Sequence, residues 1–519
     1  MEMPRIGRIA RVPFLCCCLF AFAAPAADVT FRVGDAAGPI RPLLGVNAGP
    51  MACGEPGNAD VTGAYRQVGV HSVRTHDYYG PLDMAVLYPD RTKDPSDPAS
   101  YNFTQSDAHY AKILDAGFEV FFRLGDSWNN AKPPVGTQER ANWAAAAVEV
   151  LRHYREGQWN GFVSGFRYAE IWNEPDNAQF WPAPRTREEF YDLYVRTAQA
   201  LRAAFPGLKV GGPGVTPAGA LAPQGRDWTR AFLDRVKAAG APLDFFSWHL
   251  YTNEPSEYDN VAAFYRAELD VRGYTAVESV NTEYNTDINH SGVDPETALE
   301  LRCHGLGAAI NTAGWIALQE NGVTEATFYR GNDPNIALPQ FYGLFYADGR
   351  PKKIALAFRL WSETVAACTD RLAVSVVDGS APAFRLLAGR AATGAPLVFL
   401  AANPGDAAVD WAAEPPWGGT LADCALELQT VSDAAEGIVT TLPYGAEVSV
   451  PGRAVIRLTA VLRGDVSLDG VVSIADACLL AAGLAGSIIL PPAGVLAADV
   501  DADGRTDAAD LVVLLGKLN

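Results

Sequence analysis

The chain has 519 residues, more than one hydrophobic core normally organises, so two or three domains are expected. Hydrophobic residues make up 49% and charged residues 19%, which indicates a folded protein rather than a disordered one. The formal net charge of −19 argues against nucleic acid and anionic membrane as partners, because both would be repelled. Neutral partners such as sugars remain open.

The first residues have the pattern of an export signal. Arginines precede an apolar run over 12–24, small residues follow it, and cleavage is expected near Ala26 or Ala27. A membrane anchor is the alternative, but the run is shorter than the roughly 20 apolar residues that a spanning helix needs. We therefore predict a signal peptide over residues 1–27, a secreted protein and no membrane association.

Short apolar runs then alternate with longer amphipathic stretches, which is typical of parallel strands joined by helices. The predicted helices include Glu139–Tyr154, Glu188–Ala204 and Asp227–Ala239. Eight predicted strands are Leu43–Asn47, His71–His76, Glu119–Leu124, Gly165–Asn173, Lys209–Gly212, Asp244–Leu250, Ser279–Glu283 and Glu325–Tyr329. Eight such units predict a (β/α)8 TIM barrel, with a catalytic domain over 28–368. A doubly wound sheet is the alternative, but the Gly-rich turn that it usually carries after an early strand is missing from the sequence.

The sequence pattern changes after Trp361, where short strand-like segments are separated by Pro, Gly and Asp. These segments are Ala373–Val377, Leu397–Ala401, Cys424–Leu428 and Ala454–Leu458. They predict a β-sandwich domain over 369–462. Val29–Val33, near the start of the mature chain, is a candidate for an additional strand of that domain.

Two glutamates end predicted strands on the side where a barrel gathers its functional residues. Glu174 ends the fourth strand, which Pro175 stops, and Glu283 ends the seventh. Glycosidic bonds break through a positively charged transition state, which usually requires one protonated and one ionised carboxyl group. We interpret Glu174 and Glu283 as this pair, although each could instead be an exposed loop residue. Glu170, on the same strand face, is interpreted as a satisfied carboxylate lower in the barrel.

Other polar and aromatic residues follow neighbouring strands. Arg74 and His76 end the second strand, and Asp126 and Trp128 follow the third. All four are candidates for shaping a sugar subsite. For Trp128, packing against the protein is the competing interpretation.

Four segments together resemble a known family. They are Trp172-Asn-Glu-Pro-Asp176 followed by Phe180-Trp181, Val210-Gly-Gly-Pro213, Phe246-Ser-Trp-His249-Leu-Tyr251, and Thr282-Glu283-Tyr-Asn285. Residues of about 40 to 365 resemble clan A glycoside hydrolases, and the order of the segments resembles family 39, which includes β-xylosidases and α-L-iduronidases.

The resemblance implies a retaining, double-displacement mechanism that needs no cofactor. Glu174 would match the general acid/base and Glu283 the nucleophile. Asn173 would bond the sugar 2-hydroxyl, while His249 and Tyr251 would line the same subsite. We therefore expect a β-xylosidase-like enzyme acting on polysaccharide or oligosaccharide fragments. An arabinofuranosidase, a uronic-acid-releasing enzyme and a non-catalytic carbohydrate-binding protein stay open as alternatives.

The last part of the chain, residues 463–519, contains two similar acidic loops, each leading into an apolar helix, Ala477–Leu484 and Leu511–Leu518. The oxygen-bearing residues have the spacing of calcium loops, with a glycine at the sixth position. They are Asp465, Ser467, Asp469 and Asp476 in the first loop, and Asp499, Asp501, Asp503, Asp507 and Asp510 in the second. Acidic turns in a solvated tail are the alternative interpretation.

As a pair, these loops resemble a type I dockerin. The resemblance implies bound calcium and a cohesin-type protein partner. Two departures bear on this: Ser467 stands where Asn or Asp is usual, and Ile474-Ala475 and Ala508-Ala509 lack the hydroxyls that cohesin-binding dockerins often carry.

Overall fold

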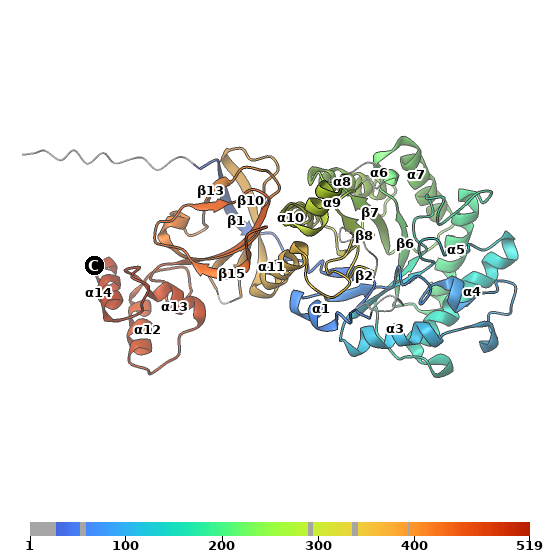
Figure 1. Cartoon of the computed structure of the whole chain (residues 1–519), viewed down its shortest axis with the longest axis horizontal. Helices are drawn as coiled ribbons and strands as arrows, with labels where there is room; N and C mark the ends of the chain where they lie inside the picture. The colour runs from blue at the N-terminus through green and yellow to red at the C-terminus, as the bar shows by residue number, and fades with distance from the viewer. Residues whose placement is uncertain (1–26, 52–58, 289–293, 335–340, 393, 519) are drawn as a thin grey trace, which may run out of the picture.

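The structure, a computed structural model, describes residues 27–51, 59–288, 294–334, 341–392 and 394–518. Three bodies follow one another in Figure 1: a barrel, a sheet domain and a small helical module at the C-terminus. The predicted signal segment lies almost entirely outside the described residues. None of the described helices combines the length and apolarity needed to cross a membrane.

The predicted TIM barrel is confirmed, because eight parallel strands close into a ring in chain order. They are β2 (Gly45–Asn47), β3 (Ser72–Arg74), β4 (Glu119–Leu124), β5 (Tyr168–Ile171), β6 (Lys209–Val215), β7 (Phe245–Tyr251), β8 (Glu278–Asn285) and β9 (Glu325–Phe328). Each coincides with one predicted strand. Apart from an edge residue in five of them, these strands are buried, since helices cover the outside and side chains fill the inside.

Helices surround the barrel (Figure 1). They are α1 (Thr62–Val68), α2 (Met84–Leu87), α3 (Thr104–Asp115), α4 (Gly136–Glu156), α5 (Arg187–Ala204), α6 (Ala218–Leu221), α7 (Pro223–Ala238), α8 (Ser256–Asp270), α9 (Pro295–Cys303), α10 (Gly305–Glu320) and α11 (Lys353–Ala367). Short 3-10 turns occupy Pro98–Ser100 and Gln158–Asn160. The start of α5 illustrates the local control: the Thr186 side chain accepts a bond from the backbone N–H of Glu189, whose carboxylate bonds back to Thr186.

The second domain is a nine-stranded sheet in the order β15-β14-β17-β12-β11-β10-β1-β13-β16. Its strands are β1 (Val29–Ala36), β10 (Cys368–Gly379), β11 (Arg385–Ala391), β12 (Leu397–Asn403), β13 (Val409–Glu414), β14 (Cys424–Val431), β15 (Glu436–Thr441), β16 (Val448–Val450) and β17 (Ala454–Leu462), with a 3-10 turn at Leu421–Asp423. Because β16 also contacts β12 and β17, the sheet curls over an enclosed core. The N-terminal strand β1 pairs with β10 and β13, so the range 28–368 contains one strand of the sheet domain.

The two faces of strand β12 contribute side chains to two different cores, which connects the sheet domain to the barrel. Phe399 and Ala401 face the core of the sheet domain, whereas Leu400 and Ala402 belong to the large core of the barrel and its helices. Since successive side chains of a strand point to opposite faces, burial on both faces explains why this strand is apolar throughout.

The C-terminal module consists of α12 (Ile474–Leu484), α13 (Pro492–Ala498) and α14 (Ala508–Leu518). The two predicted helices lie within α12 and α14, and α13 between them was not expected. Val466, Leu480 and Leu514 lie in the module's own core. A second cluster, formed by Val461, Leu468 and Ala497, connects it to the sheet domain.

Candidate active site

Glu174 lies on a strained turn at the end of β5. Trp172 has a φ of 78° and Glu174 one of 46°, values that side-chain-bearing residues rarely adopt. The surrounding strands hold this turn, since Trp172 N–H donates to the Leu124 carbonyl at 2.6 Å and Glu174 N–H to the Gly214 carbonyl at 2.9 Å. The strain is therefore compensated by the barrel, which directs the Glu174 side chain to the barrel mouth.

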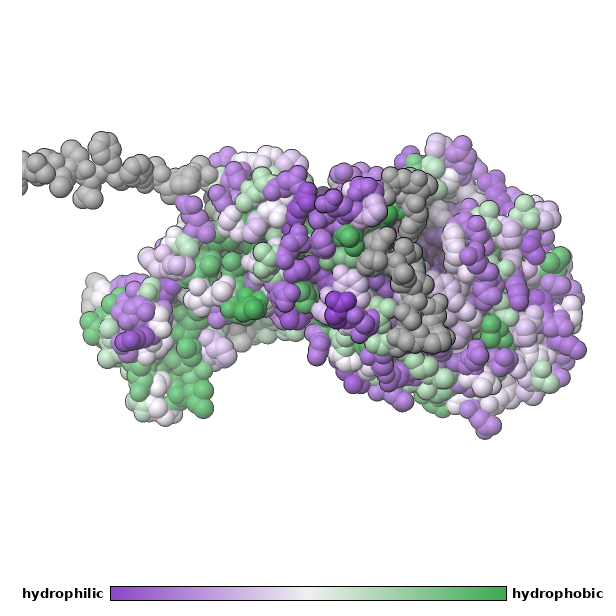
Figure 2. Space-filling model, viewed as in Figure 1, coloured by the Kyte–Doolittle hydropathy of each residue, from purple (hydrophilic) through white to green (hydrophobic). Residues whose placement is uncertain are grey.

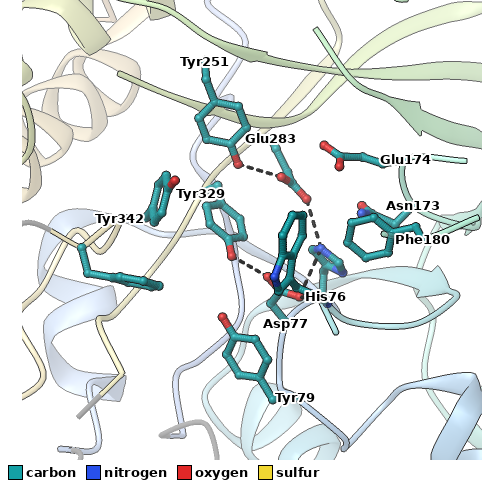
Figure 3. A pocket seen from close by; sticks show the side chains of 12 residues that line it. His76, Asp77, Tyr79, Asn173, Glu174, Phe180, Tyr251, Glu283, Tyr329 and Tyr342 are labelled. Carbon is teal, nitrogen blue, oxygen red and sulfur yellow. Dashed lines mark hydrogen bonds and ion pairs between the residues drawn. The ribbon is translucent and has the colours of Figure 1, made fainter. Parts of the chain in front are cut away.

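Glu283 lies in β8 and is held by three donors, of which Tyr251 and His76 are drawn in Figure 3. Arg74 Nη1 lies 2.8 Å from its Oε1, His76 Nε2 lies 3.2 Å from the same atom, and the Tyr251 hydroxyl donates to Oε2 at 2.7 Å. Such donors stabilise an ionised carboxylate.

The two carboxyl groups face each other beside His249. His249 Nδ1 lies 2.9 Å from Glu174 Oε1 and 3.5 Å from Glu283 Oε2. The nearest oxygens of the two glutamates lie within 4.8 Å of one another. These three side chains have the donor types of a metal site. A histidine placed between two carboxyl groups at a barrel mouth equally suits acid–base chemistry.

Arg74 is the hub beneath this pair. The fully buried guanidinium donates to Glu170 at 2.7 Å, to Glu283 at 2.8 Å, to Asn173 at 2.7 Å and to Asn47 at 2.9 Å. One cation thus connects β2, β3, β5 and β8 at the level of the site.

Glu170 is satisfied, as interpreted from the sequence. It accepts bonds from Ser247 at 2.6 Å and Thr282 at 3.0 Å in addition to Arg74. It is fully buried and is not part of the cavity wall among the described residues.

Burial raises the pKa of both glutamates, but their neighbours differ. It raises the pKa of Glu174 to about 7, with only partial opposition from the Asn177 amide and Arg74. Burial also raises the pKa of Glu283, opposed by His249 and Arg74. Burial lowers the pKa of His249, so its imidazole is favoured in the neutral form. Glu283 contacts a guanidinium directly and Glu174 does not, which makes Glu174 the more readily protonated of the two.

A cavity of about 540 Å³ opens above the pair. Its walls are formed by His76, Asp77, Tyr79, Trp128, Asn173, Glu174, Phe180, Tyr251, Glu283, Tyr329, Phe341 and Tyr342. Six of the predicted site residues are among them. Arg74 and His249 lie behind the wall, fully buried.

Asp126 is the predicted residue that the structure places elsewhere. Its carboxylate accepts the backbone N–H groups of Ala85 at 2.7 Å and Lys132 at 2.9 Å, and it does not line the cavity. An expectation that Asp126 contacts sugar is therefore corrected: the side chain turns away to accept bonds from the first turn of α2 and from the loop amide of Lys132, which would otherwise lack these partners.

Several wall residues were not predicted. Tyr329 ends the eighth predicted strand and Asp77 follows His76 directly, so the strand-end rule could have found both. Phe341 and Tyr342 come from the loop after β9 and carry no such signal.

The comparisons with known proteins agree with this geometry. Residues 55–282 match glycosyl hydrolases family 39, and residues 463–519 match the dockerin type I domain. The chain carries a family 39 glycosyl hydrolase domain and a type I dockerin domain.

Among curated relatives, a β-xylosidase from Geobacillus stearothermophilus is 26% identical over 219 residues, covering 40% of this chain and 41% of the relative. The α-L-iduronidase of Mus musculus is 29% identical over 199 residues, covering 35% and 30%. The chain thus spans less than half the length of these relatives.

Similar solved structures cover a larger share of this chain than the curated relatives do. A glucosidase from Croceicoccus marinus has a TM-score of 0.67 at 26% identity, covering 83% of this chain and 98% of that one. A monomeric β-xylosidase from Caulobacter crescentus CB15 has a TM-score of 0.58, covering 83% and 99%. Its identity of 16% shows the fold alone.

The loops of the dockerin domain have the donor set that calcium prefers. In the second loop, oxygens of Asp499, Asp501 and Asp503 lie within 4.8 Å of one another. Asp510, at the twelfth position, accepts the N–H groups of Val500 at 2.6 Å and of Asp501 at 3.1 Å, which holds the loop closed.

The first loop follows the same plan. Asp476 accepts the N–H of Ser467 at 2.7 Å, and Asp465 accepts that of Gly470 at 2.8 Å. Asp507 in the second loop corresponds to Ser473 in the first, and each begins the helix that follows its loop. The residues present therefore fit one calcium ion per loop.

Proposed function

We propose that this chain is a retaining glycoside hydrolase, β-xylosidase-like, that acts on polysaccharide or oligosaccharide fragments. The observation that carries the proposal is the pair of glutamates whose oxygens lie within 4.8 Å of one another across one cavity. Retaining enzymes keep their carboxyl groups about 5–5.5 Å apart, whereas inverting enzymes need about 6.5–9.5 Å to admit a water molecule.

Each glutamate has a role that its surroundings support. In the first step, a Glu283 oxygen bonds to the anomeric carbon while Glu174 gives its proton to the departing glycosidic oxygen. In the second step, Glu174 removes a proton from water, whose oxygen displaces Glu283 from the sugar. Donors around Glu283 favour its ionised form, and Asn173, fixed by Arg74, is available to bond the sugar 2-hydroxyl.

The test is hydrolysis of a panel of nitrophenyl glycosides, with the anomer of the first-formed product identified by proton NMR. We expect one or more neutral glycosides to be cleaved with retention of anomeric configuration. First-formed product of opposite configuration would refute the double displacement. Sugar binding without turnover on the panel and on polysaccharide digests would favour the non-catalytic alternative.

The pH dependence should report on Glu174. A general acid must be protonated, so with a pKa of about 7 we expect kcat/KM to fall tenfold per pH unit above about pH 7. Glu174→Gln should flatten this alkaline limb, measured with a nitrophenyl glycoside whose departing group needs little protonation. An alkaline limb that persists unchanged in Glu174→Gln would assign it to another group.

We also propose that the dockerin domain binds calcium, one ion per loop. Calorimetric titration of the chelator-stripped full chain should show two ions bound, with an increase in the melting temperature of the module. Asp499→Ala should bind one ion fewer. Asp348→Ala removes an exposed carboxylate paired with Arg350 on the barrel and should still bind two.

Finally, we propose that the protein is secreted and that the dockerin domain binds a cohesin-type partner. Figure 2 shows hydrophobic side chains gathered on this module. Strongly exposed apolar residues there are Val471 (61%), Ile474 (64%), Ile489 (99%) and Val512 (70%). Exposed apolar side chains gathered on one module favour a protein partner. Calcium-dependent capture of the full chain by purified cohesin modules would test it, and absence of capture by any of them would count against it.

A further inference from the structure

The charged groups of the cavity wall are all acidic. Asp77, Glu174 and Glu283 contribute carboxyl groups, and among the described residues no lysine or arginine lines the cavity. The internal segments outside the described ranges, 52–58, 289–293, 335–340 and Thr393, contain no lysine or arginine in the sequence. The remaining ionisable wall residue with a cationic form, His76, is neutral, because burial lowers its pKa well below the usual value.

Four arginines lie near the cavity, and none of them is among the described residues that line it. Arg123, whose charge acts on His76, is fully buried and pairs with Asp83 at 2.9 Å. Arg74 is fully buried and bonded to Glu170 and Glu283. The guanidinium carbon of Arg302 lies 3.7 Å from the ring centre of Tyr342.

Arg330 is also fully buried, with its guanidinium carbon 5.6 Å from the ring centre of Tyr79. Wall aromatics therefore contact Arg302 and Arg330, and the Glu283 carboxylate pairs with Arg74.

Apart from Asn173, the uncharged part of the wall is aromatic. Tyr79 and Trp128 are 42% and 43% exposed at the rim, and Trp128 meets Phe180 edge to face at 5.7 Å between ring centres. Tyr329 and Tyr342 also line the cavity and lie beside each other, with ring centres 5.2 Å apart (Figure 3). Aromatic faces suit the C–H surfaces of a sugar ring, and they offer nothing to a carboxylate that has lost its water.

We infer that this cavity selects a neutral sugar residue and discriminates against a uronic acid. The inference rests on the proposed function, because that function is what makes the ligand a glycoside. It concerns binding of the glycoside and not its turnover. A uronate would bring a carboxylate into a wall that already carries three carboxyl groups, of which Glu283 is the ionised one in the proposed mechanism. Like charges brought together in a partly desolvated site repel strongly.

The test uses sulfur-linked glycosides, which resist hydrolysis and therefore report binding whether or not the chain is catalytically active. Isothermal titration of the full-length protein compares the 4-nitrophenyl 1-thio-β-D-xyloside, -glucoside and -glucuronide. The last two differ only in the oxidation state of C6. We expect the glucuronide to bind about 100-fold more weakly than the better neutral ligand.

A charge inserted in the wall provides the second arm. Trp128→Lys places a cation at the rim and should reduce the discrimination about tenfold, whereas Trp128→Gln, which removes the ring without adding charge, should leave it unchanged. A glucuronide that binds as tightly as the neutral ligands would overturn the inference, as would a lack of measurable binding by both neutral ligands. Failure to cleave ordinary glycosides, with the binding preference intact, would overturn the proposed function alone.

Discussion

Replacing Glu283 by glycine should lower kcat/KM on a nitrophenyl glycoside by at least about 10⁴-fold, because no other carboxylate can bond to the anomeric carbon from that side. Added azide is small enough to enter the space that the side chain leaves. It would attack the sugar directly and give a glycosyl azide of inverted configuration.

The corresponding glycine variant of Glu174 should behave differently. Its nucleophile is intact, so azide would attack the covalent intermediate and give a product of retained configuration. The two product stereochemistries, measured by NMR, assign the roles, and exchanged stereochemistries would contradict the assignment proposed above. Glu278→Gln serves as a matched control, because Glu278 begins the same strand, pairs with Lys209 and lies outside the cavity wall. Its activity should stay within about threefold of the wild type.

Arg74→Met should destabilise the barrel by about 3–5 kcal/mol, because it leaves buried carboxylates without their cation. Arg74 and Glu170 are both fully buried, so water cannot take over the interaction. The barrel transition in scanning calorimetry measures the change. The double variant Arg74→Met/Glu170→Gln should recover about half of the loss, since it also removes one of the unpaired charges.

An exposed pair provides the comparison. Arg32 and Glu414 lie 2.8 Å apart in the sheet domain, with side chains 61% and 44% exposed. Arg32→Met should cost less than about 1 kcal/mol, because solvent screens the pair. Equal losses in the two single variants would show that burial of the Arg74 hub is not what stabilises the barrel.

Much of the fold was predictable because it is encoded by local patterns. Short apolar runs at regular spacing predicted all eight barrel strands, and the acidic loops predicted the two helices that follow them. Pro175 marked where the fourth strand stops, which made Glu174 a strand-end residue. The rule that parallel strands present their carboxyl ends to one mouth then paired Glu174 with Glu283 before any distance was known.

Other features depend on contacts between distant parts of the chain, which local patterns do not specify. The sequence offered Val29–Val33 as a candidate strand of the sheet domain, but its pairing with β10, more than 300 residues away, became known only from the folded chain. Asp126 follows its strand just as a site residue would, yet its carboxylate accepts bonds from the backbone N–H groups of Ala85 in α2 and of Lys132.

The sequence by itself thus determined the order of the eight barrel strands, the two glutamates at strand ends and the paired acidic loops, since these follow from periodicity, strand ends and spacing. Only the tertiary structure decided the bonding of Arg74 to four groups, the turning away of Asp126, and the aromatic, acidic wall to which Tyr342 contributes. The physical reason is that side-chain direction at a strand end or in a loop is set by which neighbours barrel closure brings within bonding distance.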